Sequence, residues 1–480
     1  MQFNSYVFVL LFLPLQVISY FLSNRINDKF GKVVIVIGSI IFYAYSDITL
    51  IKVILLSGII NYLFSICINR FNWKRVFLCI PIIINVTLLL YFKYTNFAVS
   101  NINTLFAREI PLKTIIQPLG ISFFTFQQIS YLVSVYRGIV NTSILDYMAY
   151  ILYFPKILMG PLVEPADFYQ QINNTELKKI DWNNIAVGIK LFSYGLFKKL
   201  LLADTFAKAV SWGYSNISTA TSMDWIFITL FYTFEIYFDF SGYSDMAVGL
   251  SLMLNITLPM NFDSPYKALS IRDFWKRWHI SLTSFFTKYI YIPLGGSRKG
   301  KLFIFVNTMI VFIISGIWHG SNWTFILWGI LHGAFSIFDR VTEDKQKKIF
   351  KPMRWIMTFA VTNVLWLLFR SDSIQQWKEI VRTICLFQNT TITGGLLDAF
   401  NLPEQAFILK IIPFMNKLSG VRSLGMLLFT FSAFAICLIP ENNYRNKEKI
   451  SWTSMIYASV AFVWAYTCLG AESVFVYFNF

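Results

Sequence analysis

The sequence predicts an all-α protein that crosses a membrane many times. Of its 480 residues, 56% are hydrophobic and only 14% are charged, whereas soluble domains average about 25% charged residues. Many apolar residues lie in continuous runs of about 20, the length that a helix needs to cross the hydrocarbon core. These runs do not alternate apolar and polar residues, so they do not favour an outer-membrane barrel.

The runs predict where the spans lie. The run at 33–46 is short, and the long run at 223–250 carries acidic residues, so both predict a tilt, a break or re-entry. Segment 185–203 is interpreted as an amphipathic helix at the cytoplasmic surface, because lysines interrupt its apolar face. The alternative is that this segment crosses the membrane. Segment 145–163 is a further candidate span. The predicted spans are 6–23, 33–46, 49–69, 76–95, 114–135, 223–250, 302–318, 322–338, 353–370, 422–440 and 452–472.

The formal net charge of +16 indicates cytoplasmic loops rather than a nucleic-acid partner, since Lys and Arg collect on the cytoplasmic side of membrane proteins. The basic loops around 24–32 and 70–75 lie two short crossings apart, so we expect both in the cytoplasm and the N-terminus outside. The patches at 297–301 and 343–354 are expected there too. The first apolar run is expected to be a retained span, and the five scattered cysteines predict neither disulfides nor a metal site.

All three histidines lie between His279 and His332. Ionisable residues at membrane depth are functional candidates, and neutral imidazole can act as a general base. On one continuous helix His319 and His332 would lie about 20 Å apart, and no paired ligand spacing is present, so no metal site is predicted. Gly316 and Gly320 flank His319 and predict a kink or a close backbone approach. A structural histidine, hydrogen-bonded inside a helix bundle, is the alternative at each position.

Charged residues surround this region. Glu235 and Asp239 share a helix face and, with Asp245, either line a polar cavity or pair with the basic stretch. That stretch, "IRDFWKRWHISLTSFFTKYIYIPLGGSRKGK", is expected to lie at the cytoplasmic interface. Its charges either fix the topology alone or attract a phosphate-bearing donor such as a coenzyme A thioester. The candidate donor-binding residues are Arg272, Lys276, Arg277, Arg298 and Lys299.

Six motifs, in order over about 118–338, resemble the membrane-bound O-acyltransferase family, and most closely its bacterial alginate-type O-acetylases. They are "PLGISFFTFQ", "YFPKILMGPL", "YFDFSGYSDMAVG", "NFDSPYKALSIRDFWKRWHISLTSFF", "YIPLGGSRKG" and "GIWHGSNWTFILWGILHG". The resemblance implies one integral membrane domain over 1–480, with this core flanked by spans in 1–113 and 353–480. It also implies a multi-helix bundle with a central funnel or tunnel, in the inner membrane of a bacterium.

The resemblance also implies roles for the histidines and the substrates. His319, in the W-H-G motif, would be catalytic, His279 would be the second recurrent position, and His332 would match the less settled L-H-G position. Acetyl-CoA would be the cytoplasmic donor, with no bound cofactor. The acceptor would be an extracytoplasmic polysaccharide, peptidoglycan, or a partner protein that passes the acetyl group on. A related branch transfers D-alanine to teichoic acid, but its members tend to be shorter.

We therefore expect an acetyl-CoA-dependent O-acyltransferase. His319 would either deprotonate the acceptor hydroxyl or carry the acetyl group as acyl-imidazole. His279 would orient substrate, and Trp318, His332, Glu235, Asp239 and Asp245 are candidate tunnel-lining residues. A proton-coupled transporter and a non-catalytic platform for extracytoplasmic enzymes are the rival interpretations.

Overall fold

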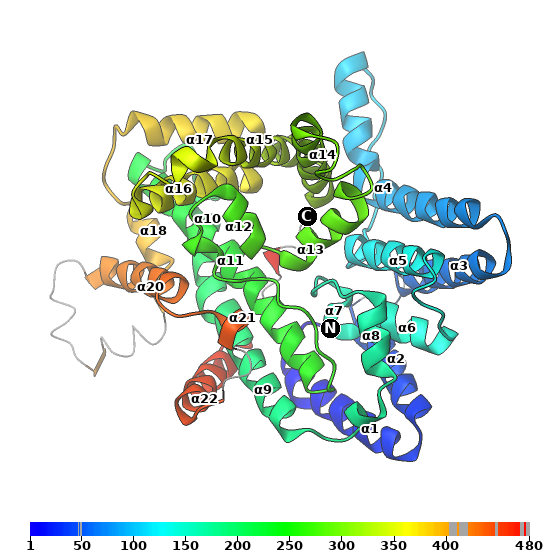
Figure 1. The fold of residues 1–480 in the computed structure, drawn as a ribbon. Helices are drawn as coiled ribbons and strands as arrows, with labels where there is room; N and C mark the ends of the chain where they lie inside the picture. Colours follow the sequence, from blue (N-terminus) through cyan, green and yellow to red (C-terminus); the bar gives the residue numbers. More distant parts are fainter. Residues whose placement is uncertain are drawn as a thin grey trace. The chain divides into compact units, whose positions relative to one another are not determined.

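All regular secondary structure in the described residues is helical (Figure 1), which confirms the predicted all-α class. The computed structural model describes residues 1–46, 48, 50–402, 410–411, 421–446, 450–470 and 475–476. The chain forms two compact units. The first comprises Met1–Leu196, Tyr243–Met260 and Glu448–Phe480, and the second comprises Phe197–Gly242 and Asn261–Lys447.

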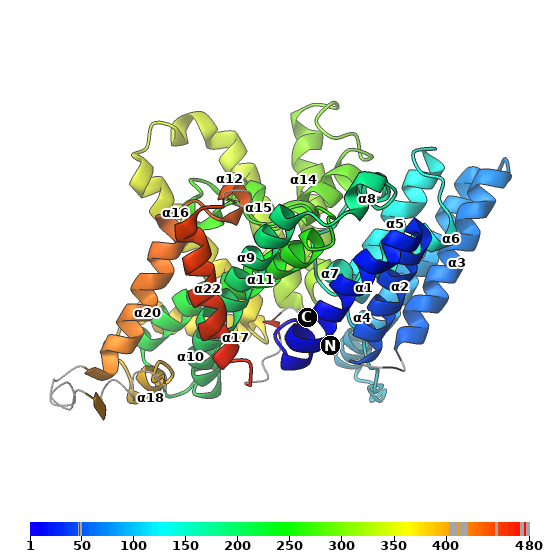
Figure 2. The ribbon, with the colours of Figure 1, turned by 90° about the horizontal axis from the view of Figure 1, so that it is seen from below.

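The first unit is a bundle of long apolar helices. Helix α1 packs along α2, and α3, α4 and α5 pack on one another (Figure 2). Helix α2 begins where Asn27 accepts a hydrogen bond from the Lys29 amide, a common N-cap. The helices are η1 (Phe8–Phe12), α1 (Leu13–Ile26), α2 (Asp28–Ala44), α3 (Ile51–Arg70), α4 (Lys74–Phe106), α5 (Ile121–Tyr136), α6 (Ile144–Leu152), α7 (Phe154–Ile157), α8 (Pro165–Ile172), η2 (Thr175–Lys178), α9 (Trp182–Phe197) and α22 (Trp452–Thr467).

Buried amides join three of these helices. Asn61 on α3 donates to Asn85 on α4 (3.0 Å) and to Gln128 on α5 (3.0 Å), and Asn85 donates back to Asn61 (2.7 Å). Without a hydrophobic force between helices in lipid, such side-chain bonds help to fix their packing. We interpret this cluster as structural.

The second unit contains all three histidines. Helices α14 and α15 form a hairpin, and α12 and α16 both pack on α15. The helices are η3 (Lys198–Ala203), α10 (Asp204–Ser215), α11 (Ser222–Leu252), η4 (Pro265–Lys267), α12 (Ile271–Arg277), α13 (Ile280–Phe286), η5 (Thr287–Tyr291), α14 (Lys301–His319), α15 (Trp323–Gln346), α16 (Lys351–Arg370), α17 (Ile374–Leu386), α18 (Gly394–Asp398), α20 (Val421–Leu438) and α21 (Asn443–Asn446). Helix α11 continues into the first unit at Tyr243.

Two glycines let the α14–α15 hairpin close. A Cβ on Gly316 would lie 2.4 Å from the Phe325 carbonyl oxygen, and one on Gly329 would lie 2.3 Å from the Phe312 carbonyl oxygen. Only glycine allows such close backbone approach. The predicted close approach at Gly316 is confirmed, whereas α14 is one continuous α-helix through this position.

Five helices among the described residues are long and apolar enough to cross a membrane. They are Phe8–Ile26, Ile51–Arg70, Lys74–Phe106, Lys301–His319 and Lys351–Arg370, and each overlaps a predicted span. The other predicted spans overlap helices outside this set, such as α2, which has 17 residues, and α11, which has 31 residues and carries acids. Together with the family assignment below, these helices make the chain a multi-pass membrane protein.

One expectation from the sequence is wrong, and another is narrowed. Of the tilt, break or re-entry predicted for 223–250, the structure excludes a break, because α11 is one continuous helix; most of this stretch, its acids included, is buried inside protein. Segment 185–203 is not a surface helix whose lysines face solvent. Lys199 is only 1% exposed and forms ion pairs with Asp239 and Asp204.

Candidate active site

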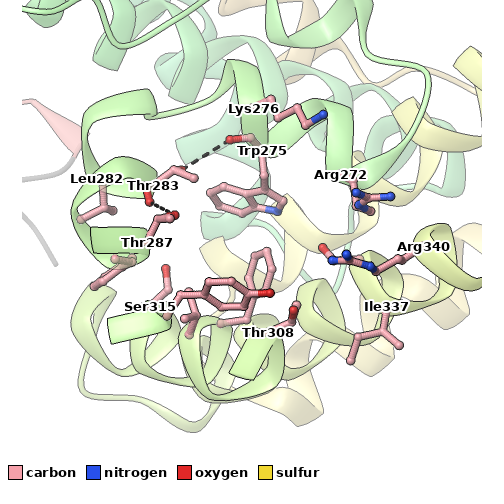
Figure 3. A pocket seen from close by; sticks show the side chains of 15 residues that line it. Arg272, Trp275, Lys276, Leu282, Thr283, Thr287, Thr308, Ser315, Ile337 and Arg340 are labelled. Carbon is pink, nitrogen blue, oxygen red and sulfur yellow. Dashed lines mark hydrogen bonds between the residues drawn. The ribbon is translucent and has the colours of Figure 1, made fainter. Parts of the chain in front are cut away.

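A cavity of about 310 Å³ lies among α12, α13, η5, α14 and α15, entirely within the second unit (Figure 3). Its floor and walls are mainly aromatic and aliphatic, with several hydroxyl groups. Thr283 donates through Oγ1 to the Trp275 carbonyl (3.4 Å), which joins α13 to α12 beside it. The lining residues are Arg272, Trp275, Lys276, Leu282, Thr283, Phe286, Thr287, Tyr291, Thr308, Val311, Phe312, Ser315, Ser336, Ile337 and Arg340.

His319 continues the cavity-lining face of α14. Thr308, Phe312 and Ser315 line the cavity and are spaced by four and three residues, so they share one helix face. His319 lies four residues beyond Ser315 on the same face, about 6 Å further along the helix axis. The histidine predicted to be catalytic therefore ends a stripe of side chains that leads from the cavity toward the hairpin turn.

His332 has the same relation to α15. His332, Ser336 and Arg340 follow one another at four-residue intervals, and the last two line the cavity. Arg340 was not predicted as a site residue, although its eight-residue distance from His332 could have indicated it. The stripe runs from a buried imidazole to an exposed guanidinium.

His279 directly precedes α13, whose residues Leu282, Thr283 and Phe286 line the cavity. It caps the N-terminus of α13 with φ 48° and ψ 51°, a left-handed conformation that side chains other than glycine seldom adopt. Asn261 holds the next two residues, since its carbonyl accepts from the Ile280 amide (3.0 Å) and its Oδ1 accepts from the Ser281 amide (3.1 Å). Burial lowers the pKa of His279 to about 3, so the imidazole is neutral near pH 7.

Aromatic rings connect the three histidines. The Trp318 ring lies 6.3 Å from the His279 ring and 4.8 Å from the His319 ring, measured between centroids. The Trp328 ring lies 5.2 Å from His319 and 4.7 Å from His332. The structure therefore brings together four residues that the sequence singles out separately, His279, His319, His332 and Trp318, and adds Trp328. His319 and His332 lie on two helices of a hairpin rather than on one continuous helix, and aromatic rings surround all three histidines.

The comparisons with known proteins identify the family to which the chain belongs. The model of the membrane-bound O-acyltransferase family matches residues 139–371, which contain the three histidines and the whole cavity. The peptidoglycan O-acetyltransferase of Helicobacter pylori is 31% identical over 100% of this chain and 97% of its own length. The chain belongs to the membrane-bound O-acyltransferase family. The resemblance drawn from the six motifs is confirmed, and the protein is an acyltransferase.

Other family members differ in how much of the chain they match. The probable alginate O-acetylase AlgI of Azotobacter vinelandii is 35% identical over 79% of this chain and 77% of its own length. The teichoic acid D-alanyltransferase of Streptococcus thermophilus is 27% identical over 51% of this chain and 64% of its own length. The acetylating relatives therefore share more of this chain than the D-alanylating one.

Only some of the predicted donor-binding residues line the cavity. Arg272 and Lys276 line the cavity together with Arg340 (Figure 3), and Arg272 also pairs with Glu343 (3.0 Å). Arg277 instead bonds to Asp273 (2.9 Å). Arg298 and Lys299 are exposed in the segment before α14 and do not line this cavity.

The predicted acidic residues lie outside this cavity. Asp239 accepts from Lys199 (2.8 Å), which also pairs with Asp204 (2.9 Å), so its partner lies outside the basic stretch. Glu235 is buried one turn before Asp239 on α11, and Asp245 belongs to the first unit. None of the three lines the cavity. In the described part of the chain, no three His, Cys, Asp or Glu side chains are grouped so as to hold a metal ion.

Substitution of His279 tests whether its imidazole or its backbone conformation matters. We expect His279→Ala to lower turnover, since it removes the ring and leaves a strained left-handed residue, a conformation that costs about 1–2 kcal/mol. His279→Gly removes the same ring without the strain. Both His and Ala carry this strain at position 279, so His279→Gly should be the more stable of the two variants. Equal turnover losses in both variants, despite this difference in stability, would assign the loss to the imidazole. Wild-type turnover in His279→Gly would remove His279 from the site.

Proposed function

We propose that the protein moves an acetyl group from cytoplasmic acetyl-CoA to a hydroxyl group of an extracytoplasmic glycan, with peptidoglycan as the first candidate, in a bacterial inner membrane. The observation that supports this most is the cavity in the second unit. Three basic side chains line it, and the helices α13, α14 and α15 that form its walls also carry or begin at the three histidines. Such a site has one end suited to a charged donor and another suited to acyl transfer.

The basic side chains suit the phosphates of coenzyme A. Arg272, Lys276 and Arg340 lie at the part of the cavity far from Ser315 in Figure 3, and charge-assisted bonds from Arg to phosphate are strong and often bidentate. Trp275, Val311 and Phe312 form apolar walls further in. The donor's phosphates would bind at the basic side chains, and its uncharged pantetheine arm would follow the apolar walls toward His319.

The length of α14 fits a site reached from both sides of the membrane. His319 lies 18 residues beyond Lys301, about 27 Å along the axis, close to the thickness of the hydrocarbon core. With the basic patch before Lys301 in the cytoplasm, His319 lies toward the opposite face. An acceptor from outside and a thioester from inside can then meet at one imidazole.

His319 would act as the general base. Its imidazole takes the proton of the acceptor hydroxyl while the hydroxyl oxygen attacks the thioester carbonyl carbon. When the tetrahedral intermediate collapses, the carbon–sulfur bond breaks and the leaving thiolate of coenzyme A takes the proton from the imidazolium. In the alternative route His319 attacks the thioester itself and carries the acetyl group as acyl-imidazole. Rapid quenching with labelled acetyl-CoA and no acceptor distinguishes them, because only the second route labels the protein.

The choice of acceptor is supported by the relatives. The Helicobacter pylori peptidoglycan O-acetyltransferase aligns with the whole chain, whereas the Azotobacter vinelandii alginate relative aligns with 79% of it. The acetyl group would reach the glycan directly or through an extracytoplasmic partner protein. Acetyl transfer is favoured over D-alanyl transfer, since the Streptococcus thermophilus relative aligns with only about half of the chain.

Neutralising one basic side chain of the cavity tests the donor assignment. We expect Arg340→Gln to raise the KM for acetyl-CoA about tenfold, since a hydrogen bond to a charged group contributes about 1.5–3 kcal/mol before solvent reduces it. Arg298→Gln is the matched control, because it removes the same charge from an exposed residue outside the cavity. Steady-state release of coenzyme A gives both KM values. An equal KM change in the two variants would indicate general charge attraction rather than a bound phosphate.

The function itself is tested by two measurements. Purified protein given labelled acetyl-CoA and soluble glycan fragments should release free coenzyme A, and mass spectrometry of the cell wall should show glycan O-acetylation that disappears when the gene is deleted. A wall that keeps its acetyl groups, with another surface polymer losing them, would overturn the peptidoglycan assignment. If the purified protein releases no coenzyme A with any of the glycan fragments, the donor assignment is overturned.

A further inference from the structure

Trp275 forms one wall of the cavity and is held at two points. Its Nε1 donates to His332 Nδ1 (3.1 Å), and its carbonyl accepts from Thr283 Oγ1 (3.4 Å). Its ring also packs edge-on against Phe312, with centroids 5.4 Å apart. The indole is only 8% exposed, so the cavity touches one edge of a side chain that the protein otherwise fixes in place.

The hydrogen bond defines the protonation of His332. An indole N–H can only donate, so His332 Nδ1 must be the acceptor. A neutral imidazole whose Nδ1 accepts carries its proton on Nε2. His332 is 0% exposed, and a second proton would place a charge in an interior of aromatic rings, which is costly. In this tautomer the indole N–H occupies the Nδ1 lone pair, and Nε2 carries the proton, so neither nitrogen is free to take up a proton from a substrate.

We infer that His332 is a positioning residue for the acyl donor: it accepts the Trp275 N–H bond and thereby fixes the indole wall against which the donor's acyl-bearing arm lies. This inference rests on the proposed donor cavity. It assigns proton transfer to His319 and excludes it from His332. Its physical basis is preorganisation, since a wall that is already ordered costs less to order when the donor binds.

The position of His332 agrees with this role. Ser336, one turn further along α15, lines the cavity, while His332 itself does not. Its ring lies 5.1 Å from the ring of Trp275, which lines the cavity, and 4.7 Å from the ring of Trp328, which does not. His332 therefore supports the surface that meets the donor, without being part of that surface.

A double-mutant cycle on the complete protein tests the inference. The variants are His332→Asn, whose amide oxygen can still accept a hydrogen bond, His332→Leu, which cannot, Trp275→Phe, and the Trp275→Phe/His332→Leu double variant. We expect His332→Asn to keep the wild-type KM for acetyl-CoA and the wild-type kcat. We expect His332→Leu to raise this KM about tenfold, the upper end for one lost hydrogen bond, with little change in kcat.

The cycle separates this role from a structural one. If His332 acts through the indole N–H, Trp275→Phe and the double variant should have the same KM, because the second change has no remaining bond to remove. Trp355→Phe is the matched control, since it removes another indole bond, to the Tyr266 carbonyl (2.8 Å), away from the cavity; its KM should not change. Thermal unfolding in detergent identifies any variant that fails to fold.

Three outcomes would overturn the inference. These are a large loss of kcat in His332→Asn, which would indicate proton transfer by His332; additive changes in KM in the double variant; or a change in KM for Trp355→Phe equal to that of His332→Leu. Failure of the proposed function would be seen differently, as a wild-type protein that releases no coenzyme A from acetyl-CoA.

Discussion

We expect replacement of His319 by alanine or glutamine to abolish acetyl transfer while the protein remains folded. His319 is the side chain at the inner end of the α14 stripe, 4% exposed and packed against the rings of Trp328 and Phe369 at 5.2 Å and 5.4 Å. General-base assistance alone contributes about 10²–10⁴-fold, and positioning of donor and acceptor adds to it. We therefore expect turnover to fall by at least this factor.

The measurement is coenzyme A release with acceptor present, together with the KM for acetyl-CoA. Because His319 lies beyond the residues that line the cavity, the variants should still bind the donor. A fall in kcat with an unchanged donor affinity is the expected result. Glutamine is the stricter test, since it keeps polarity and similar volume but cannot exchange a proton. Wild-type turnover in His319→Gln would refute the assignment, and retained glycan acetylation in cells would favour a platform that only docks other enzymes.

Replacement of Lys199 by methionine should destabilise the protein strongly. Lys199 is 1% exposed and lies 2.8 Å from Asp239, which is 0% exposed, and 2.9 Å from Asp204. Removing one partner of a buried pair leaves an uncompensated buried charge and typically costs about 3–5 kcal/mol. We expect a large drop in the midpoint of thermal or chemical unfolding in detergent.

The exposed pair Lys179–Glu176 supplies the control. Both of its side chains are 77% exposed, and surface ion pairs contribute about 1 kcal/mol or less, so Lys179→Met should change stability little. Adding Asp239→Leu to Lys199→Met should restore part of the loss, because the stranded charge is then removed. An equal effect of Lys199→Met and Lys179→Met would contradict a buried network.

The sequence names all three histidines as candidates, but it does not predict that they form a cluster. His279 and His319 lie 40 residues apart, and no local pattern brings them together; they meet because α12, α13 and the α14–α15 hairpin fold on one another. Their grouping could be expected only from the resemblance and from their polar nature in apolar surroundings. Within a single helix the sequence does predict which residues share a face. Arg340 lies eight residues after His332, so both are on the same face of α15.

The wrong expectation has a physical cause. The lysines in 185–203 are interpreted from their own segment alone, as the solvated face of an amphipathic helix. In the structure Lys199 and Asp239 neutralise each other across 40 residues of sequence, so each segment can be buried. A charge inside an apolar run therefore predicts either solvent or a distant partner, and one sequence cannot separate the two. For the same reason Arg298 and Lys299 could not be distinguished from Arg272 and Lys276, because tertiary packing decides which basic residues line the cavity.

Filling the cavity tests the central claim most directly. Ser315→Phe places a ring where α14 lines the cavity, one turn before His319, whereas Ile313→Phe places the same ring on α14 outside the lining residues. The measurement is coenzyme A release from acetyl-CoA by the two purified variants, after both are shown to unfold at similar temperatures. The account predicts that Ser315→Phe loses donor binding and turnover while Ile313→Phe keeps both. Turnover by a folded Ser315→Phe at the wild-type rate would contradict it, since the donor would then reach His319 by another route.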